Sequence, residues 1–383
     1  MDFAFTEEQQ LFADTVRRFA LEQLLPHYAT WDDGTPFPPD KLKALADLGV
    51  VGLRVPERFG GTDSSFVMAG IASEELARGD FNTTYYLQIA AIVATLLTDH
   101  ATDAVQDEWL PRLAAGDTTL AFGLTEPGAG SDAAAIQTRA RRDGDDWLIS
   151  GEKASITFAG LADACVVFAR SGDEGAHGIS AILVPLDQDG VTRQTYASAG
   201  SKLSARGSLF FDDARAPLDH LLGDEGRGFY QAMDSFDYNR AIIALACLGA
   251  AQQSLDETIE YVKQRHTFGK PLAKREGIAF QIAEHLTLIE AARLLAYQTL
   301  WLRDNDQPHV KEAAMAKWLG PKTATDAIHA SLLMHGHYGY SKEFPFEQRL
   351  RDVIGLEIGD GTPEIMKGIV AREAIGRDYT AYR

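Results

Sequence analysis

The C-terminal part of the chain contains four long stretches of helical periodicity, and these constrain the fold more than any other feature. They run over about residues 229–265, 275–304, 308–337 and 363–376. Each stretch is long enough to form one member of an antiparallel helical bundle. The sequence therefore predicts a C-terminal four-helix bundle.

Two blocks with a different pattern precede this bundle. The first 115 or so residues show apolar positions at helical spacing, starting after a capping box formed by Thr6 and Gln9. Short β-prone runs then alternate with turn signals such as Asp143-Gly144. We expect an α+β protein with an N-terminal all-α domain, a middle β-barrel or β-sandwich domain and a C-terminal four-helix bundle. The expected boundaries are 1–119, 120–225 and 226–383.

Net charge and cysteine usage exclude several classes of function. The 383-residue chain has a formal net charge of −19, so we expect no binding to nucleic acid or to an anionic membrane surface, both of which need basic patches. The start of the chain shows no signal peptide, and no segment reaches the length of a membrane span. Its two cysteines, Cys165 and Cys247, lie in apolar surroundings. These features predict a cytoplasmic protein without a disulfide framework.

A glycine-rich loop, Leu124 to Asp132, is the first candidate for ligand binding. It contains Gly128, Gly130 and two hydroxyl residues, so its backbone N–H groups can approach a phosphate or a ring carbonyl closely. The loop matches neither the dinucleotide-binding fingerprint nor a phosphate-binding loop with a Gly-Lys-Ser/Thr ending. From the residues alone, an ordinary connection stays open as the alternative.

A second candidate is Asp360, which lies between Gly359 and Gly361. Thr362 is a suitable N-cap and Pro363 a favoured first helical residue, so we expect the positive end of a helix dipole beside this carboxylate. Such a corner can hold an anion or an oxyanion. A solvated Asp in a glycine-rich turn is the alternative that these residues leave open.

Several motifs, in order along the chain, resemble those of the acyl-CoA dehydrogenase flavoproteins. The motifs are Leu124 to Asp132, Gly151-Glu152-Lys153 followed by Ile156-Thr157, Phe236-Asp237-x-x-Arg240, Arg265-x-Thr267-Phe268-Gly269, Arg351-Asp352 and Gly361-Thr362. The order of a helical, a β and a helical domain resembles that family too. The resemblance covers essentially the whole chain and implies an acyl-CoA dehydrogenase-like fold.

The resemblance implies FAD as cofactor and an acyl-CoA thioester as substrate. The residues expected at FAD are Phe122, Leu124, Thr125, Gly130, Ser131, Ser155, Thr157, Arg265, Thr267, Phe268, Leu333, Gly336, His337, Thr362 and Glu364. The residues expected at the substrate are Ser131, Asp237, Arg240 and Gly361. In the family, the positions matching Arg265, Thr267 and Phe268 reach FAD from a neighbouring subunit, so a homo-oligomer, usually a tetramer, is implied.

Asp360 stands where the family places its catalytic Glu. The resemblance implies that it takes a proton from the carbon next to the thioester carbonyl while the next carbon gives a hydride to the flavin. Electrons are then expected to pass to an electron-transferring flavoprotein. Some branches of the family place the base at the position of Asn239, which cannot titrate. No cluster of His, Cys and acidic residues at ligand spacing suggests a metal.

Some positions depart from the family pattern. Asp is one methylene shorter than Glu, which withdraws the carboxylate by about 1.5 Å. Gly359 and Ser155 stand where aromatic residues are common, which predicts a wide cavity and a cyclic or branched acyl group, such as a cyclohexane-type carboxyl-CoA ester. Leu333 and His337 replace a Gln and a Gly, and Glu276 a Gln, at the expected contacts to the partner's FAD.

Three alternatives remain at this point. The chain could be an acyl-carrier-protein dehydrogenase of a biosynthetic pathway, or a nitroalkane-oxidase-like flavoenzyme, since those oxidases also use an Asp base. It could also be a catalytically idle relative that binds a partner. The charge of −19 argues against a nucleic-acid partner for such a relative.

Overall fold

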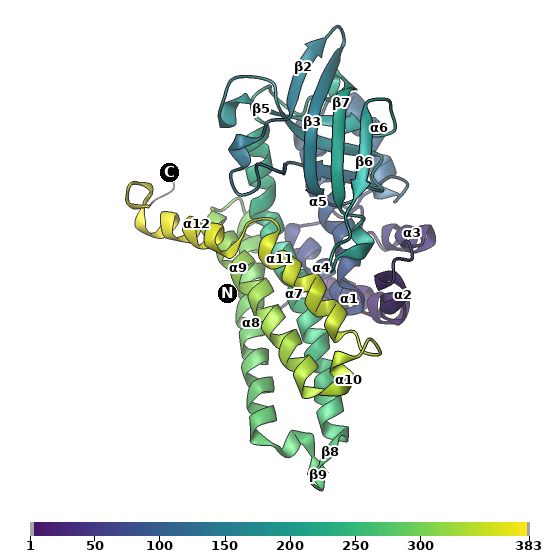
Figure 1. Ribbon diagram of the computed structural model, residues 1–383, viewed down its shortest axis with the longest axis vertical. Coiled ribbons are helices and arrows are strands. Elements are labelled where there is room, and N and C mark those ends of the chain that lie inside the picture. Colours follow the sequence, from purple (N-terminus) through teal and green to yellow (C-terminus); the bar gives the residue numbers. More distant parts are fainter. Residues whose placement is uncertain (1–3, 381–383) are drawn as a thin grey trace.

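A curled β-sheet lies at one end of the molecule and long helices extend from it to the other end (Figure 1). This computed structural model describes residues 4–380. The N-terminal helices are α1 (Glu7–Phe19), α2 (Tyr28–Asp32), α3 (Pro39–Asp47), α4 (Phe66–Gly79), α5 (Thr84–His100) and α6 (Asp103–Ala114). The predicted capping box is confirmed, because Thr6 and Gln9 exchange side-chain to backbone hydrogen bonds at the start of α1. No helix within residues 4–380 is long and apolar enough to cross a bilayer.

The middle part of the chain forms one seven-stranded sheet. Its strands are β1 (Leu120–Gly123), β2 (Arg139–Asp143), β3 (Asp146–Ile156), β4 (Ala164–Arg170), β5 (Ile179–Pro185), β6 (Val191–Thr195) and β7 (Gly207–Pro217). Their order is β1-β4-β2-β3-β7-β6, and β5 pairs with β4. The register between β3 and β7 shifts between Lys153 and Ile156. This bulge bends β3 where it reaches the helices, and bulges of this kind re-aim side chains.

The C-terminal part is helical, as the periodicity predicts. It consists of α7 (Gly228–Gln264), α8 (Glu276–Asp304), α9 (Val310–Met334), α10 (His337–Tyr340), α11 (Phe346–Ile358) and α12 (Pro363–Ile375). A small hairpin, β8 (His266–Thr267) and β9 (Lys270–Pro271), joins α7 to α8. The expected fold class, with a helical domain, a β domain and a helical bundle, is confirmed.

One helix of the bundle differs from the prediction. The fourth predicted stretch, 363–376, corresponds to α12, which projects sideways in Figure 1, whereas α11 packs along α9 and α7. The sequence analysis did not include α11, although Phe346, Val353 and Leu356 recur at helical spacing on its buried face. The charged Arg349 and Asp352 are buried on the same helix.

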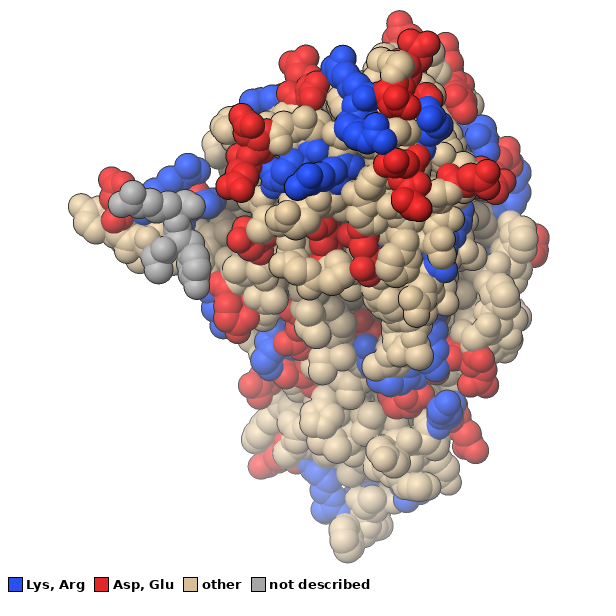
Figure 2. Space-filling model, turned by 45° about the horizontal axis from the view of Figure 1, so that its top comes forward, with Lys and Arg blue, Asp and Glu red and all other residues tan. Residues whose placement is uncertain are grey.

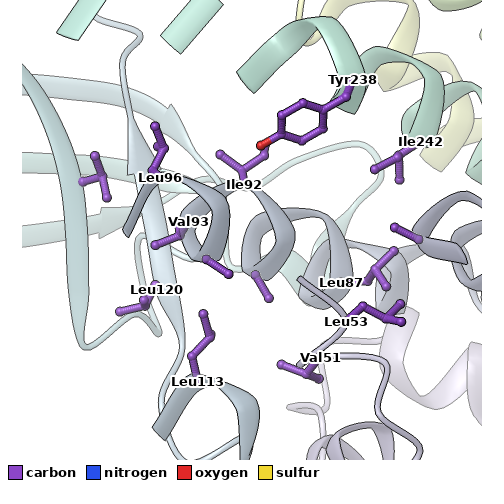
Figure 3. Packing of buried hydrophobic residues seen from close by; sticks show 14 of the residues in the cluster. Val51, Leu53, Leu87, Ile92, Val93, Leu96, Leu113, Leu120, Tyr238 and Ile242 are labelled. Carbon is purple, nitrogen blue, oxygen red and sulfur yellow. The ribbon is translucent and has the colours of Figure 1, made fainter. Parts of the chain in front are cut away.

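Helix α5 lies at the centre of the core that connects the three parts (Figure 3). Its residues Leu87, Ile92 and Val93 are almost fully buried, with Leu120 of β1 and Tyr238 of α7 in the same cluster. Burying an apolar side chain of this size contributes about 1.5–3 kcal/mol. The packing therefore fixes α5 against both the sheet and the bundle, and the candidate site lies along this junction.

Candidate functional site

A cleft opens where α5, α7 and the end of α11 meet the sheet. Six of the residues predicted for catalysis or cofactor binding line it: Phe122, Leu124, Thr125, Ser155, Thr157 and Asp360. They come from segments more than two hundred residues apart in sequence. The structure thus brings the middle-domain positions and the expected base together around one cavity.

Asp360 lies in the connection between α11 and α12. Its backbone is left-handed, with φ +56°, and Gly361 follows with φ +111°. Asp tolerates this region better than most residues with a side chain. The half-buried carboxylate accepts a hydrogen bond of 3.1 Å from Asn239 Nδ2. The backbone N–H of Asp360 makes no hydrogen bond within residues 4–380, so it is available to a ligand.

A buried lysine on α9 holds the connection that carries Asp360. Lys317 is 1% exposed, and its Nζ donates to the carbonyl oxygens of Leu356 at 2.6 Å and Gly361 at 3.2 Å. Burial lowers the pKa of Lys317, and the Asp360 carboxylate is the largest influence that opposes this. Lys317 therefore binds both sides of the Asp360 segment to the bundle.

Arg240 and Asp237, both expected at the substrate, form an ion pair with each other on α7. Arg240 Nη1 donates to Asp237 Oδ1 at 2.7 Å, and Arg240 is only 6% exposed. Burial lowers the pKa of Arg240, while Asp237 and then Asp360 oppose the change. Neither residue lines the cleft. The ion pair is therefore buried near Asp360. The contact of Arg240 and Asp237 with the substrate stays a prediction.

A second buried ion pair fixes the glycine-rich loop. Lys153 Nζ donates to Glu126 Oε1 at 2.7 Å and to the carbonyl of Leu124 at 3.0 Å, while Glu126 also accepts from the backbone N–H groups of Gln137 and Thr138. Burial lowers the pKa of Lys153 to about 8, against the effect of Glu126. Burial opposes ionisation of Glu126, yet Lys153 and the N–H donors keep its pKa below the usual value. Sequence motifs included Lys153 but did not predict this role.

The β3 bulge faces the same loop. Ser155 has φ +58°, and the neighbouring Ala154 N–H donates to the Thr125 carbonyl at 2.8 Å. Gly130 and Ser131, further along the loop, are exposed and do not line the cleft. A side chain at Gly130 would meet open space. The loop is therefore anchored at Thr125 and open at its tip.

The remaining predicted cofactor contacts lie elsewhere on the chain. Arg265, Thr267 and Phe268 lie at the β8–β9 hairpin, and Phe268 is 95% exposed. Leu333, Gly336 and His337 are exposed at the end of α9 and the start of α10. Both groups lie at the end of the bundle away from the sheet (Figure 1). A single chain does not bring them to the cleft.

Three predicted contacts follow Asp360 directly. Thr362 caps α12 through a 3.5 Å hydrogen bond from the Ile365 N–H, as expected from the sequence, and Glu364 is exposed on the first turn. The carbonyl oxygen of Gly361 accepts a hydrogen bond from Lys317 Nζ. None of the three lines the cleft, so their contacts with FAD or substrate stay predictions.

Sequence reasoning missed several residues of the site. Asn239 was considered only as an alternative base, whereas its amide contacts Asp360. Gln88 and Arg206 line the cleft but belong to no recognised motif. Lys317 could have been suspected, because a Lys that falls on the apolar face of a predicted helix needs a buried partner.

The chemistry of the cleft fits a flavin ring. The hydroxyls of Thr125, Ser155 and Thr157 and the turn backbone around them lie beside the apolar Phe122 and Leu124. Binding sites for cofactors of this size combine apolar walls with a few placed polar groups. Among residues 4–380, no group of three His, Cys, Asp or Glu side chains is arranged to hold a metal ion.

Comparison with known proteins gives a consistent result. Models of the N-terminal, middle and C-terminal domains of acyl-CoA dehydrogenase match residues 6–117, 121–214 and 226–375. The chain is 39% identical to the mitochondrial short-chain specific acyl-CoA dehydrogenase of Bos taurus, over 95% of this chain and 89% of the relative. The structure resembles butyryl-CoA dehydrogenase from Megasphaera elsdenii, with a TM-score of 0.94, 32% identity and coverage of 98% and 100%. It also resembles a glutaryl-CoA dehydrogenase from Mycobacterium smegmatis in complex with FADH2, with a TM-score of 0.93, 28% identity and coverage of 99% and 97%.

Proposed function

The chain belongs to the acyl-CoA dehydrogenase family and is an FAD-dependent oxidoreductase that acts on a CH–CH group, and we propose that Asp360 is its catalytic base. One observation carries this proposal. Among the residues that line the cleft, Asp360 alone has a carboxylate. Abstraction of a proton next to a thioester carbonyl needs a base within hydrogen-bond reach of that carbon.

The residues around Asp360 support this role. In the proposed reaction the carboxylate takes the α-proton of the acyl group, and negative charge develops on the thioester oxygen. The free backbone N–H of Asp360 is suited to donate to that oxygen. Phe122, Leu124, Thr125, Ser155 and Thr157 would hold the flavin, and FAD, when bound, supplies the acceptor for the β-hydride. Lys317 and Asn239 keep the base in place.

The wall of the cleft favours a compact, bulky acyl group. Gly355 and Gly359 both line the cleft one turn apart. A Cβ added at Gly355 would meet nothing within 4 Å, and one at Gly359 would make only an ordinary contact with the Gly355 carbonyl. Together with the short base, this free space supports a cyclic or branched acyl group on CoA. The bovine relative is named as short-chain specific, which agrees with a compact substrate.

We propose Asp360→Asn as the test of the base. The variant should still fold and bind FAD, because Asn is isosteric and only the charge is removed. The reduction of the flavin by any acyl-CoA should fall by about 10²–10⁴-fold, the usual contribution of a general base. Anaerobic mixing with a panel of CoA thioesters, cyclic ones included, measures this rate. A variant reduced as fast as the wild type would move the base to another residue.

The surface of the bundle supports assembly into a homo-oligomer, which we propose is a tetramer. Phe280, Leu294 and Trp301 are exposed on α8 at multiples of seven residues, so they form one apolar face. In Figure 2 charged side chains are dense at the top of the view, whereas the lower part is mostly uncharged. In such an oligomer, Phe268 and the end of α9 could meet the FAD of a neighbouring subunit.

An electron-transferring flavoprotein is the proposed electron acceptor. The proposal is based on the family to which the chain belongs. Turnover with a purified electron-transferring flavoprotein, compared with turnover under oxygen alone, tests it. Equal rates under oxygen alone would instead indicate an oxidase.

A further inference from the structure

One wall of the cleft is polar, although the proposed proton transfer needs only Asp360. Tyr85 and Gln88 lie one turn apart on α5 and line the cleft, and Asn239 lines it from α7. Each of the three residues is at most 3% exposed. A hydrocarbon acyl group would cover the side-chain oxygen of Gln88 without donating to it, which costs free energy.

Asn239 has one side-chain atom without a partner. Its Nδ2 donates to Asp360, and the reverse orientation of the amide would place two oxygen atoms against each other. The Oδ1 atom is therefore directed away from Asp360, and it is buried without a hydrogen bond. Buried acceptors of this kind nearly always have a donor in the functional state of a protein.

Gln88 offers a second acceptor. Its Nε2 donates to Thr84 Oγ1 at 2.9 Å, and no residue within 4–380 donates to its Oε1. The neighbouring Tyr85 hydroxyl is held 3.0 Å from Ser201 Oγ, and the Ser201 N–H donates to Asp352 of α11. The polar wall is thus fixed in position by contacts with two other elements.

Another part of the lining is apolar. Ile89 and Ile92 of α5, together with Phe122 and Phe236, contribute to it. A ligand that satisfies both parts needs an apolar skeleton with a hydrogen-bond donor on one side. An anionic substituent can pair with Arg206, which also lines the cleft, but it has no hydrogen to donate to an acceptor oxygen. An ammonium group would pair with the Asp360 carboxylate and remove the base. A neutral hydroxyl can donate a hydrogen bond and leaves the Asp360 carboxylate free.

We propose that the acyl group carries a hydroxyl substituent that donates to Gln88 Oε1. This inference rests on the proposed function, because it describes the substrate of the same cleft. Gln88 is the specificity-determining residue that can be tested separately, since Asn239 also positions the base.

The test compares cyclohexanecarboxyl-CoA with its 3-hydroxy and 4-hydroxy derivatives. For the wild-type holoenzyme, kcat/KM for flavin reduction should be at least about tenfold higher with one of the hydroxylated esters, because a site built to bond a hydroxyl discriminates against its absence. Gln88→Leu should reduce this ratio to near one while it still turns over the unsubstituted ester. Thermal unfolding of the variant shows whether it folds.

A binding measurement separates recognition from catalysis. In the Asp360→Asn holoenzyme, calorimetry should show tighter binding of the preferred hydroxylated ester, and addition of Gln88→Leu should remove the difference. As a matched control, Ile89→Val alters the apolar wall and should change both esters by a similar factor. A wild-type enzyme that prefers the unsubstituted ester, or a ratio unaffected by Gln88→Leu, overturns the inference. Tighter binding of the hydroxylated ester, together with no flavin reduction by any ester in the wild-type enzyme, would uphold the inference and refute the proposed function.

Discussion

At the scale of single residues, the conformation of Asp360 explains why this position accepts an Asp. The residue is in the left-handed region, where Asp is enriched among non-glycine residues, and Gly361 follows at a φ that favours glycine. Asn239 contacts the carboxylate from α7. The base is therefore short and held from one side, beside Gly355 and Gly359, where an added Cβ would meet at most one ordinary contact.

Asp360→Glu tests whether the short side chain of Asp360 fits the acyl group. The added methylene should advance the carboxylate into the space that a cyclic ester occupies, so kcat/KM for cyclohexanecarboxyl-CoA should fall by about 10–100-fold. Activity on straight-chain butyryl-CoA should rise, because that substrate leaves the space free. Steady-state kinetics with both esters measure the two changes. If kcat/KM changed by the same factor for both esters, the short side chain of Asp360 would not be an adaptation to a bulky acyl group.

At the scale of elements, α9 supports the site through a single buried cation. Lys317 donates to the last turn of α11 and to the residue after Asp360. The Leu356 carbonyl lies in the last turn of α11, where backbone acceptors lack partners within the helix, and the Gly361 carbonyl lies in the connection before the N-cap of α12. The lysine thus donates to both carbonyl groups and holds the catalytic connection against α9.

Lys317→Met should keep the shape of the side chain but remove both hydrogen bonds. We expect kcat/KM to fall by about 10–100-fold because displacement of the base by about 1 Å has an effect of that order. FAD content should stay close to that of the wild type, since Lys317 does not line the cleft. Lys322→Met is the control: it lies on the same helix, half exposed and paired only with Asp326, and should leave the kinetics unchanged. Wild-type kinetics for Lys317→Met would contradict the supporting role.

At the scale of the whole molecule, some of the residues predicted to contact FAD lie far from the cleft. The β8–β9 hairpin and the end of α9 lie at the end of the bundle away from the sheet. Phe268 is almost fully exposed at the hairpin, and Leu333 is 61% exposed nearby in the fold. Exposed apolar side chains of this size at one end of a molecule are typical of an interface between subunits.

Phe268→Asp tests this arrangement. A carboxylate buried in an apolar interface has no partner of opposite charge, which destabilises the interface. The variant should therefore form smaller oligomers than the wild type and retain less FAD after gel filtration. Sedimentation velocity and the flavin-to-protein absorbance ratio measure both effects. Lys270→Asp, in β9 of the same hairpin, changes the charge of an exposed side chain by two and is the comparison: it should leave assembly and FAD content closer to the wild type. Unchanged assembly and FAD content for Phe268→Asp would remove the hairpin from the interface.

Local sequence determined much of this protein. Periodicity gave the helical and β parts and most helices of the bundle, because apolar repeats follow directly from helix and strand geometry. The capping residues Thr6 and Thr362 and the turn at Asp143-Gly144 depend on neighbours within four residues, so they too could be predicted. The family motifs added the expected base and the flavin loop.

Only the tertiary structure decided how the site is held. Lys317 and Asn239 contact the Asp360 segment from helices that lie 44 and 121 residues away in sequence, and the charged Arg349 and Asp352 are buried on α11. Burial and hydrogen bonding of charged side chains depend on which distant segments surround them. No local pattern contains that information, because the free energy of a buried polar group is set by its partners and not by its neighbours in sequence.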